Sequence, residues 1–349
     1  MGKTDILGLL PDELSDFLVS IGEPKYRGAQ LYGWLMKGRE IGEMTNLPAS
    51  LREKLAEHAE MRLPKVERKL VSKLDGTVKY LFRLIDGECV ESVVMRYEHG
   101  ISICISSEVG CPMGCVFCAS TIGGKVRNLT ASEMLGQIVA ASRDIGERIS
   151  NVVMMGIGEP LDNYDNTVRF LRLVNEEKGL GIGYRHISLS TCGVVPMIDR
   201  LREENIPITL SVSLHAAEDE ARSAIMPINR RYPLGELMPA CRRYFDGSGR
   251  RISFEYTLIR GKNDSEKNAD TLVQLLRKYF SDKGKLLPLH VNLIPVNEVK
   301  ERDFSRSDKA AVDNFARFLN SKGVNATVRR RLGSDINASC GQLRRESQR

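Results

Sequence analysis

Six strand-like runs separated by helical segments dominate the chain after residue 130 and constrain the fold more than any other feature. Two of the intervening segments, ASEMLGQIVAASRDI (131–145) and EKNADTLVQLLRKYF (266–280), carry apolar residues at helical spacing. Regular alternation of strands and helices predicts βαβ connections and a parallel sheet. Six such strand–helix units favour an α/β fold with a partial (β/α)6 barrel, in which functional residues stand at the carboxyl ends of strands. The expected strands are 151–155, 185–190, 208–214, 252–259, 289–295 and 325–329.

The first 100 residues follow a different pattern. Apolar spacing with Pro and Gly breaks predicts three short helices within residues 10–22, 26–38 and 47–59. Apolar and polar residues then alternate around Asp-Gly turns at positions 75–76 and 86–87, which predicts hairpin strands. A chain of 349 residues also exceeds the ~250–300 residues at which single cores stop growing. We therefore expect a helical accessory domain at 1–70, a β-hairpin extension at 71–100 and a barrel at 101–349.

Composition and charge bear on the compartment and on the class of partner. No window of about 18 apolar residues appears, and the N-terminus is acidic where a signal peptide would be basic and then apolar. We expect a cytoplasmic protein with no membrane association. In a reducing compartment, the eight cysteines indicate metal binding or redox chemistry before disulfides. The net charge of +6 is concentrated in runs such as VRRRLG, which suits a polyanionic partner but equally suits solvated faces.

Cys111, Cys115 and Cys118 form a C-x3-C-x2-C pattern in a loop rich in Gly and Pro. Three thiolates from one loop can bind three irons of a [4Fe–4S] cluster and leave the fourth iron open to a chelating ligand. A structural zinc site would need a fourth ligand at a fixed offset, but the next Cys or His after Cys118 is His186. The spacing, with Phe117 before the last cysteine, resembles the radical S-adenosylmethionine (SAM) superfamily. That resemblance implies a [4Fe–4S] cluster and SAM as cofactors.

Further motifs narrow the resemblance. CISSEVGC, MGIGEPL, LSTCGVVP, SLHA, MPIN and CGQL resemble those of the RlmN/Cfr family of RNA adenosine methyltransferases. The N-terminal helices and hairpins resemble that family's accessory domain, so the resemblance covers nearly the whole chain. One segment departs from it, because IPVNEVKERDFSRS lacks the Trp-Asn-Pro form of some members. The loop expected to face the substrate is therefore less well defined.

The resemblance gives roles to two cysteines and a glutamate outside the C-x3-C-x2-C pattern. It implies that Cys340 takes a methyl group from one SAM and that a second SAM supplies the radical that activates this methyl group, which makes two SAM per turnover. The methylene radical adds to carbon 2 or 8 of an adenine. Glu91 matches the acceptor of the ring proton, and Cys104 matches the thiol that resolves the covalent intermediate by forming a disulfide. Without the resemblance, both cysteines would be interpreted as small buried side chains and Glu91 as a solvated edge residue.

The resemblance also implies a set of SAM contacts at or near predicted strand ends. His215 could instead be a satisfied core histidine, and Met154 and Met155 are interpreted as core residues of a strand. Cys89, Cys192 and Cys241 match no role, so buried packing is expected for them. The expected SAM contacts are Gly158, Glu159, Ser190, Ser213, Leu214, His215 and Asn292.

An adenine within a stacked duplex hides its C2 edge, so the target base must be unpaired or flipped out of the stack. Lysine and arginine would then contact the RNA phosphates. The candidates lie just after the cysteine cluster or on either side of Cys340, and they are Lys125, Arg127, Arg329, Arg330, Arg331, Arg344 and Arg345.

The preferred hypothesis is a dual-specificity enzyme that forms 2-methyladenosine in large-subunit ribosomal RNA and in certain tRNAs. Intact GEP and STCGVVP motifs favour this branch over the Cfr branch, which methylates carbon 8. Two alternatives stay open: a radical SAM enzyme of another reaction type, such as a glycyl-radical activase or methylthiolase, and an iron–sulfur or zinc RNA-binding module without catalysis. We expect a monomer, and the family implies a flavodoxin-type electron donor.

Overall fold

A ten-stranded sheet forms the centre of the computed structural model, which describes residues 2–299, 301–338 and 343–344. Its strands follow one another in the order β16-β15-β12-β11-β10-β9-β6-β5-β4-β3. Their bounds are β3 (Lys65–Val71), β4 (Val78–Arg83), β5 (Cys89–Tyr97), β6 (Gly100–Cys104), β9 (Asn151–Met154), β10 (Ile187–Thr191), β11 (Thr209–Ser213), β12 (Ile252–Leu258), β15 (Leu289–Pro295) and β16 (Ala326–Val328).

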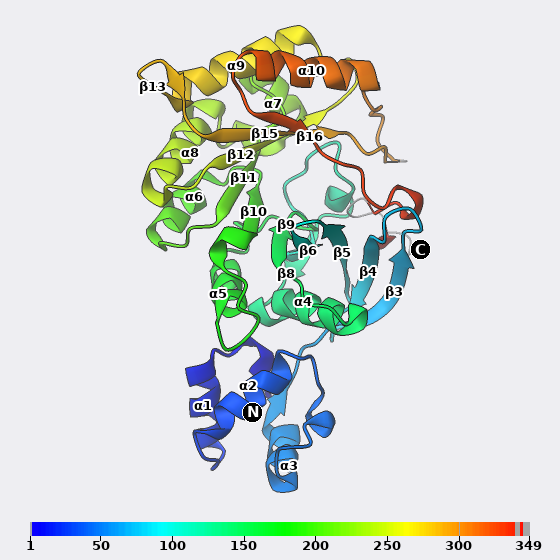
Figure 1. Ribbon diagram of the computed structural model, residues 1–349, viewed down its shortest axis with the longest axis vertical. Coiled ribbons are helices and arrows are strands. Elements are labelled where there is room, and N and C mark those ends of the chain that lie inside the picture. The colour runs from blue at the N-terminus through cyan, green and yellow to red at the C-terminus, as the bar shows by residue number, and fades with distance from the viewer. Residues whose placement is uncertain (1, 300, 339–342, 345–349) are drawn as a thin grey trace.

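All neighbours from β6 to β16 pair in parallel. Each of the six connections between them contains a helix, and these helices cover the outer face of the sheet (Figure 1). The partial (β/α)6 barrel predicted from the sequence is therefore confirmed: the six predicted strands are β9, β10, β11, β12, β15 and β16, and β6 pairs with β9 as a further parallel strand. The helices are α4 (Ala131–Ile145), α5 (Tyr164–Asn175), α6 (Val195–Glu203), α7 (Asp219–Ile225), α8 (Leu234–Ser248), α9 (Glu266–Phe280) and α10 (Lys309–Ser321).

Local chemistry explains why these segments form helices where the sequence predicts them. Thr130 Oγ1 accepts a hydrogen bond from the Glu133 N–H at 3.2 Å, and Glu133 Oε2 accepts one from the Thr130 N–H at 2.9 Å. This reciprocal cap satisfies two backbone donors that the first turn of α4 leaves unpaired. The helix ends before Gly146, whose φ of +68° only glycine adopts without strain. The apolar faces of these helices share one core with the strands.

An antiparallel extension continues the sheet beyond β6. β5 pairs with β6, β4 with β5 and β3 with β4, all antiparallel, and the predicted Asp-Gly turns join the hairpins. After β16 the chain crosses to this extension and passes beside β4 and β3 (Figure 1). The extension therefore brings the C-terminal part of the chain to the edge of the barrel.

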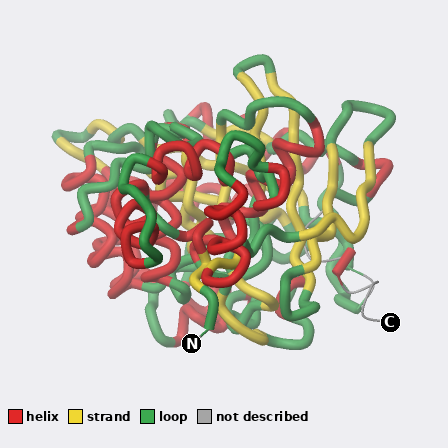
Figure 2. Tube along the Cα trace, turned by 90° about the horizontal axis from the view of Figure 1, so that it is seen from below, coloured by secondary structure: helices red, strands yellow, loops and turns green. Residues whose placement is uncertain are grey.

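Three helices, α1 (Pro11–Ser20), α2 (Arg27–Leu35) and α3 (Ala49–His58), gather at one end of the molecule, beyond α4 and α5 (Figure 1). The guanidinium of Arg169 in α5 ties them to the barrel by donating to the Gly8 carbonyl at 2.8 Å. Seen from below, helices crowd one side of the molecule (Figure 2). The domain boundaries at 70 and 100 stay a prediction, although β3, which begins at Lys65, already belongs to the large sheet.

Three short pairs of strands complete the structure: β1 (Thr4–Asp5) with β2 (Ala59–Glu60), β7 (Glu108–Gly110) with β8 (Lys125–Asn128), and β13 (Ser281–Asp282) with β14 (Lys285–Leu286). Among the described residues, none of the helices has both the length and the apolar character needed to cross a membrane.

Candidate active site

The loop that carries the C-x3-C-x2-C pattern leaves β7 through a position that requires glycine. Gly110 has a φ of +79°, and a Cβ there would lie 1.9 Å from the Gly124 carbonyl oxygen. Inside the loop, Thr121 Oγ1 donates to the carbonyls of Cys115 at 3.1 Å and Cys118 at 3.0 Å. These contacts fix the loop with its three cysteines turned towards the barrel.

One cavity joins this loop to the carboxyl ends of the strands, as the barrel fold leads one to expect. Of the residues predicted to bind cofactors, eight line it. They are Cys111, Cys115, Cys118, Gly158, Glu159, Ser190, Ser213 and His215. Leu214 and Asn292 are not among the residues that line it. Glu255, which was not predicted from the sequence, also lines the cavity.

Glu255 occupies the position next to Asn292 in the pairing of β12 with β15. Asn292 Nδ2 donates to Glu255 Oε2 at 2.6 Å, and the backbone N–H of Leu214 donates to the Glu255 carbonyl at 3.0 Å. Burial raises the pKa of the Glu255 carboxyl. Leu214 and Asn292 do not line the cavity themselves, but they hold Glu255 in place at its wall.

His215 lies between the cysteine loop and the barrel. Its ring meets Phe117 edge to face, with centroids 5.0 Å apart, and its Nδ1 accepts the Thr257 N–H at 2.9 Å. Burial, assisted by the charge of Arg222, lowers the pKa of His215 to about 3. The imidazole is therefore neutral, with its proton on Nε2, and offers one hydrogen-bond donor.

Glu159 is buried and both of its carboxylate oxygens accept backbone hydrogen bonds, from Cys192 at 2.7 Å and from Leu161 at 3.0 Å. Gly158 before it has a φ of +108°, and a Cβ there would lie 2.7 Å from the side chain of Glu108. The resemblance places Gly158 among the SAM contacts, and the structure shows that the absence of a side chain there permits close approach of β7, the strand that follows β6.

Arg222 is a residue that the sequence analysis missed. Its side chain is fully buried, and it donates to the carbonyls of Cys192 at 2.8 Å, Ser213 at 3.0 Å and Leu214 at 3.1 Å. It also donates to Asn229 Oδ1 at 2.8 Å, which explains the asparagine of the MPIN motif. A single guanidinium therefore joins the ends of β10 and β11, where the predicted SAM contacts stand.

The three clustered thiols fit a cationic iron–sulfur cluster. Burial and the neighbouring thiols raise the pKa of Cys115 to about 12, and burial likewise raises the pKa of Cys111. Their thiolates therefore need a cationic group beside them. Among the described residues, no three Cys, His, Asp or Glu side chains converge closely enough for a single metal ion. A [4Fe–4S] cluster does not require such convergence, because each thiolate binds a different iron.

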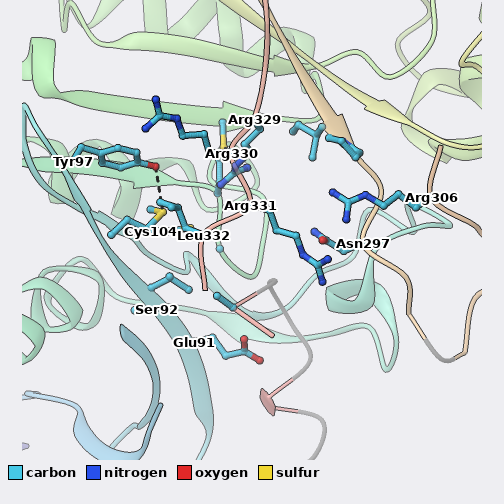
Figure 3. A pocket seen from close by; sticks show the side chains of 17 residues that line it. Glu91, Ser92, Tyr97, Cys104, Asn297, Arg306, Arg329, Arg330, Arg331 and Leu332 are labelled. Atoms are coloured by element: carbon cyan, nitrogen blue, oxygen red, sulfur yellow. Dashed lines mark hydrogen bonds between the residues drawn. The ribbon is translucent and has the colours of Figure 1, made fainter. Parts of the chain in front are cut away.

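A second cavity adjoins the first and contains Glu91 and Cys104 (Figure 3). Four residues line both cavities: Met155, Gly156, Ile294 and Arg329. Arg329, Arg330 and Arg331, from the segment after β16, line this cavity together with Asn297 and Arg306 (Figure 3). The second cavity therefore combines a carboxylate, a thiol and several guanidinium groups next to the cysteine loop.

Cys104 is buried in a cluster with Val93 and Met95, and Ala338 packs against this cluster. Burial raises the pKa of its thiol, and the charge of Arg329 acts in the opposite direction. Ala338 is the last described residue before the gap at 339–342, in which Cys340 lies. The predicted role of Cys340 therefore falls outside the described residues, whereas Leu332 and Ala338, which precede it, pack against the cluster that contains Cys104.

Polar contacts fasten the C-terminal segment to the hairpin extension. Asp335 accepts hydrogen bonds from Ser72 Oγ at 2.7 Å and from the Lys73 N–H at 2.8 Å, and Asp75 accepts one from the Gly333 N–H at 2.8 Å. Burial opposes ionisation of Asp75, but hydrogen bonds from the Gly333 N–H and from Thr77 lower the pKa of its carboxyl to about 2. The β3–β4 turn thus serves as a docking site for the segment that precedes Cys340.

Three of the basic residues proposed to contact phosphate are engaged with carboxylates instead. Lys125 pairs with Glu108 at 2.7 Å, and Arg127 pairs with Glu133 at 2.8 Å. Arg344 is buried and pairs with Glu88 at 3.2 Å. These cations hold loops of the fold together, which argues against a phosphate contact. Arg345 lies outside the described residues.

The cysteines without an assigned role are all buried, as expected. Cys241 lies in the core between α8 and the barrel, and Cys89 packs with Leu81 and Leu343. Cys192 differs from these two because it lines the cavity of the clustered cysteines.

Comparison with known proteins agrees with this geometry. A model of the radical SAM superfamily matches residues 105–273, and a model of the ribosomal RNA large subunit methyltransferase N-terminal domain matches residues 4–61. The crystal structure of a radical SAM methyltransferase from Sphaerobacter thermophilus superposes with a TM-score of 0.91 at 44% identity, covering 97% of this chain and 98% of that chain. The fold and site therefore define a radical SAM methyltransferase.

Full-length relatives identify the family. The "Probable dual-specificity RNA methyltransferase RlmN" of Alkaliphilus oremlandii is 51% identical over 99% of both chains. A relative with the same name from Clostridium botulinum strain Eklund 17B is 52% identical over 98% of this chain and 96% of its own length. The chain belongs to the RlmN family of radical SAM RNA methyltransferases. Membership implies a [4Fe–4S] cluster, SAM and an RNA substrate.

Proposed function

We propose that this protein methylates carbon 2 of an adenine in large-subunit ribosomal RNA and in certain tRNAs. The observation that carries the proposal is the junction of two cavities, one with the clustered cysteines and the other with Glu91 and Cys104. A radical formed in the first cavity would have only a short path to a methyl group held in the second. The names of the relatives give a dual specificity for RNA, and the family model matched by residues 4–61 is that of a ribosomal RNA large subunit methyltransferase, which supports the ribosomal substrate.

In the first cavity, Cys111, Cys115 and Cys118 would hold the cluster, and the neighbouring strand ends would hold SAM. Glu159, Ser190, Ser213 and the neutral His215 offer polar groups for its amino acid and ribose parts. When bound there, the cluster would supply the electron that cleaves SAM and would accept the electron that the RNA adduct releases.

In the second cavity, the thiolate of Cys340 would first accept a methyl group from one SAM, which leaves as S-adenosylhomocysteine. The radical from a second SAM takes a hydrogen atom from this methyl group, and the resulting carbon radical adds to C2 of the adenine. The adduct then loses one electron and the C2 proton, and Glu91 accepts the proton. RNA and enzyme are now joined through a thioether.

Cys104 would resolve this thioether. Its thiolate attacks the sulfur of Cys340, the carbon–sulfur bond breaks, and the carbon takes up a proton to become the methyl group. The two cysteines end as a disulfide, which an external thiol reductant must reduce before the next turnover. Arg329 beside Cys104 favours the thiolate that this step needs.

The guanidinium groups of Arg329, Arg330 and Arg331 stand where they could contact phosphates around a flipped adenine. We further propose, from the family resemblance, that a flavodoxin-type protein donates the electrons and that the enzyme acts as a monomer in the cytoplasm.

Nucleoside analysis tests the proposal. The purified protein with reconstituted iron and sulfide would be incubated anaerobically with SAM, a reductant and ribosomal RNA or tRNA. Digestion of the RNA should yield 2-methyladenosine, identified by mass and by chromatographic retention against standards. A match to 8-methyladenosine would assign the protein to the Cfr branch, and SAM cleavage without any methylated adenosine would contradict the proposal.

A further inference from the structure

A buried ion pair lies beside the second cavity. Lys79 Nζ is 2.8 Å from Glu91 Oε2, with side chains 1% and 2% exposed. In the pairing of β4 with β5, Lys79 stands opposite Val93 and Glu91 stands opposite Leu81. The two side chains are therefore diagonal neighbours on one face of the sheet. Glu91 lines the cavity and Lys79 does not, so the ammonium lies outside the cavity wall.

Both charged groups of this pair also contact the C-terminal segment. Lys79 Nζ donates to the Asn337 carbonyl at 3.1 Å, and the Arg344 N–H donates to Glu91 Oε1 at 2.6 Å. Both carboxylate oxygens thus have a donor. The contacts come from residues on either side of 339–342, so the pair ties the orientation of Glu91 to the segment that carries Cys340.

The physical reason for such a pair at a proton acceptor is the cost of burying charge. A buried carboxylate with no compensating cation favours its protonated form and cannot act as a base. Lys79 supplies this compensation by direct contact. The other titratable or charged groups that line the cavity are Cys104, Arg306, Arg329, Arg330 and Arg331.

We propose that Lys79 is a positioning residue that compensates the buried charge of the Glu91 carboxylate and keeps it aimed at the adenine until the ring proton is transferred. The inference rests on the proposed function, because it assumes that Glu91 accepts the C2 proton. The proton moves to a Glu91 oxygen, and the electron pair of the C–H bond stays with the ring. The ammonium then faces a neutral acid, which favours release of the proton to water and restores the ion pair.

The test compares Lys79→Met and Lys79→Arg with a control at Lys69. Lys69 lies on the adjacent strand β3 and pairs with Asp144 at 2.5 Å, but its side chain is 36% exposed. Each full-length variant, reconstituted with iron and sulfide, is assayed for three quantities across about pH 6 to 9: SAM cleavage, RNA–protein adduct on a denaturing gel, and methylated adenosine.

We expect Lys79→Met to cleave SAM at the wild-type rate and to accumulate adduct at neutral pH. Its methyl product should fall about a hundredfold, the low end of what a positioned general base contributes. Raising the pH should recover the product, because it restores the carboxylate. Lys79→Arg should regain most of the activity at neutral pH. Glu91→Gln should accumulate adduct at every pH, and Lys69→Met should match the wild type.

A wild-type pH profile and no adduct in Lys79→Met would overturn the inference while leaving the proposed function standing. Loss of SAM cleavage and iron from both Lys79 variants, in step with methylation, would assign the residue to folding alone and would also overturn it. Absence of adduct and of methylated adenosine from the wild type and from Glu91→Gln would instead refute the proposed function.

Discussion

Replacement of Arg222 by methionine should weaken the barrel and its SAM site together. The guanidinium has four acceptors at 2.8 to 3.1 Å and no exposed surface. Leaving a buried acceptor unpaired costs at least about 1 kcal/mol. The Leu214 carbonyl still accepts the Ala216 N–H at 2.8 Å, so the other three acceptors set the expected loss of unfolding free energy at about 3 kcal/mol. Three of these acceptors are carbonyls at the ends of β10 and β11, so SAM binding should weaken as well.

Urea denaturation of the wild type and of Arg222→Met measures this loss, and equilibrium dialysis with SAM measures the binding. Arg172 gives a matched control, since it pairs with Glu204 at 2.9 Å while 53% exposed. Arg172→Met should cost at most about 1 kcal/mol, as exposed pairs generally do. A loss below about 1 kcal/mol in Arg222→Met, with unchanged SAM affinity, would refute the reasoning.

Two further predictions concern the same cavity. Gly158→Ala places a Cβ 2.7 Å from Glu108 at a φ of +108°, so the urea midpoint should fall and SAM affinity should drop at least about tenfold. The control Gly235→Ala, whose Cβ meets nothing within 4 Å, should lower neither quantity. Equal behaviour of the two variants would contradict the packing argument. The pKa of His215 is lowered to about 3, so the unfolded chain binds more protons than the folded one between about pH 3 and 6.5, and stability should rise with pH across that window. His215→Asn should make the unfolding free energy less dependent on pH there; an unchanged slope would show that the histidine is not buried in its neutral form.

The sequence predicted the barrel well because its signals are local. Six strands and the bounds of α4 and α9 follow from periodicity and capping, and these act over a few residues. The cysteine loop and the glycine-rich element at residues 156–160 could likewise be recognised in the sequence, because the spacing of residues within one short segment determines which cofactor each can bind. Most of the predicted cofactor residues share one cavity for this reason.

Buried charges were much less predictable. Lys79 and Arg222 sit in VKYLF and DEARSAI, where a cation is ordinarily solvated, and only tertiary contacts show that both are buried. Glu255 is a lone carboxylate within an apolar strand, and this position alone could have indicated a functional residue. Lys125 and Arg127 were predicted to contact phosphates, but the structure pairs them with carboxylates. Some of these carboxylates are distant in the sequence, so the ion pairs could not be predicted from it.

The most direct test of the two-cysteine mechanism replaces Cys104 by alanine, with Cys241→Ala as control because Cys241 is buried in α8 away from both cavities. Each protein is expressed, purified under denaturing conditions and examined for bound RNA by absorbance and nuclease treatment. The account predicts RNA covalently attached through Cys340 in Cys104→Ala and none in Cys241→Ala. RNA-free Cys104→Ala with intact iron and SAM cleavage would contradict it.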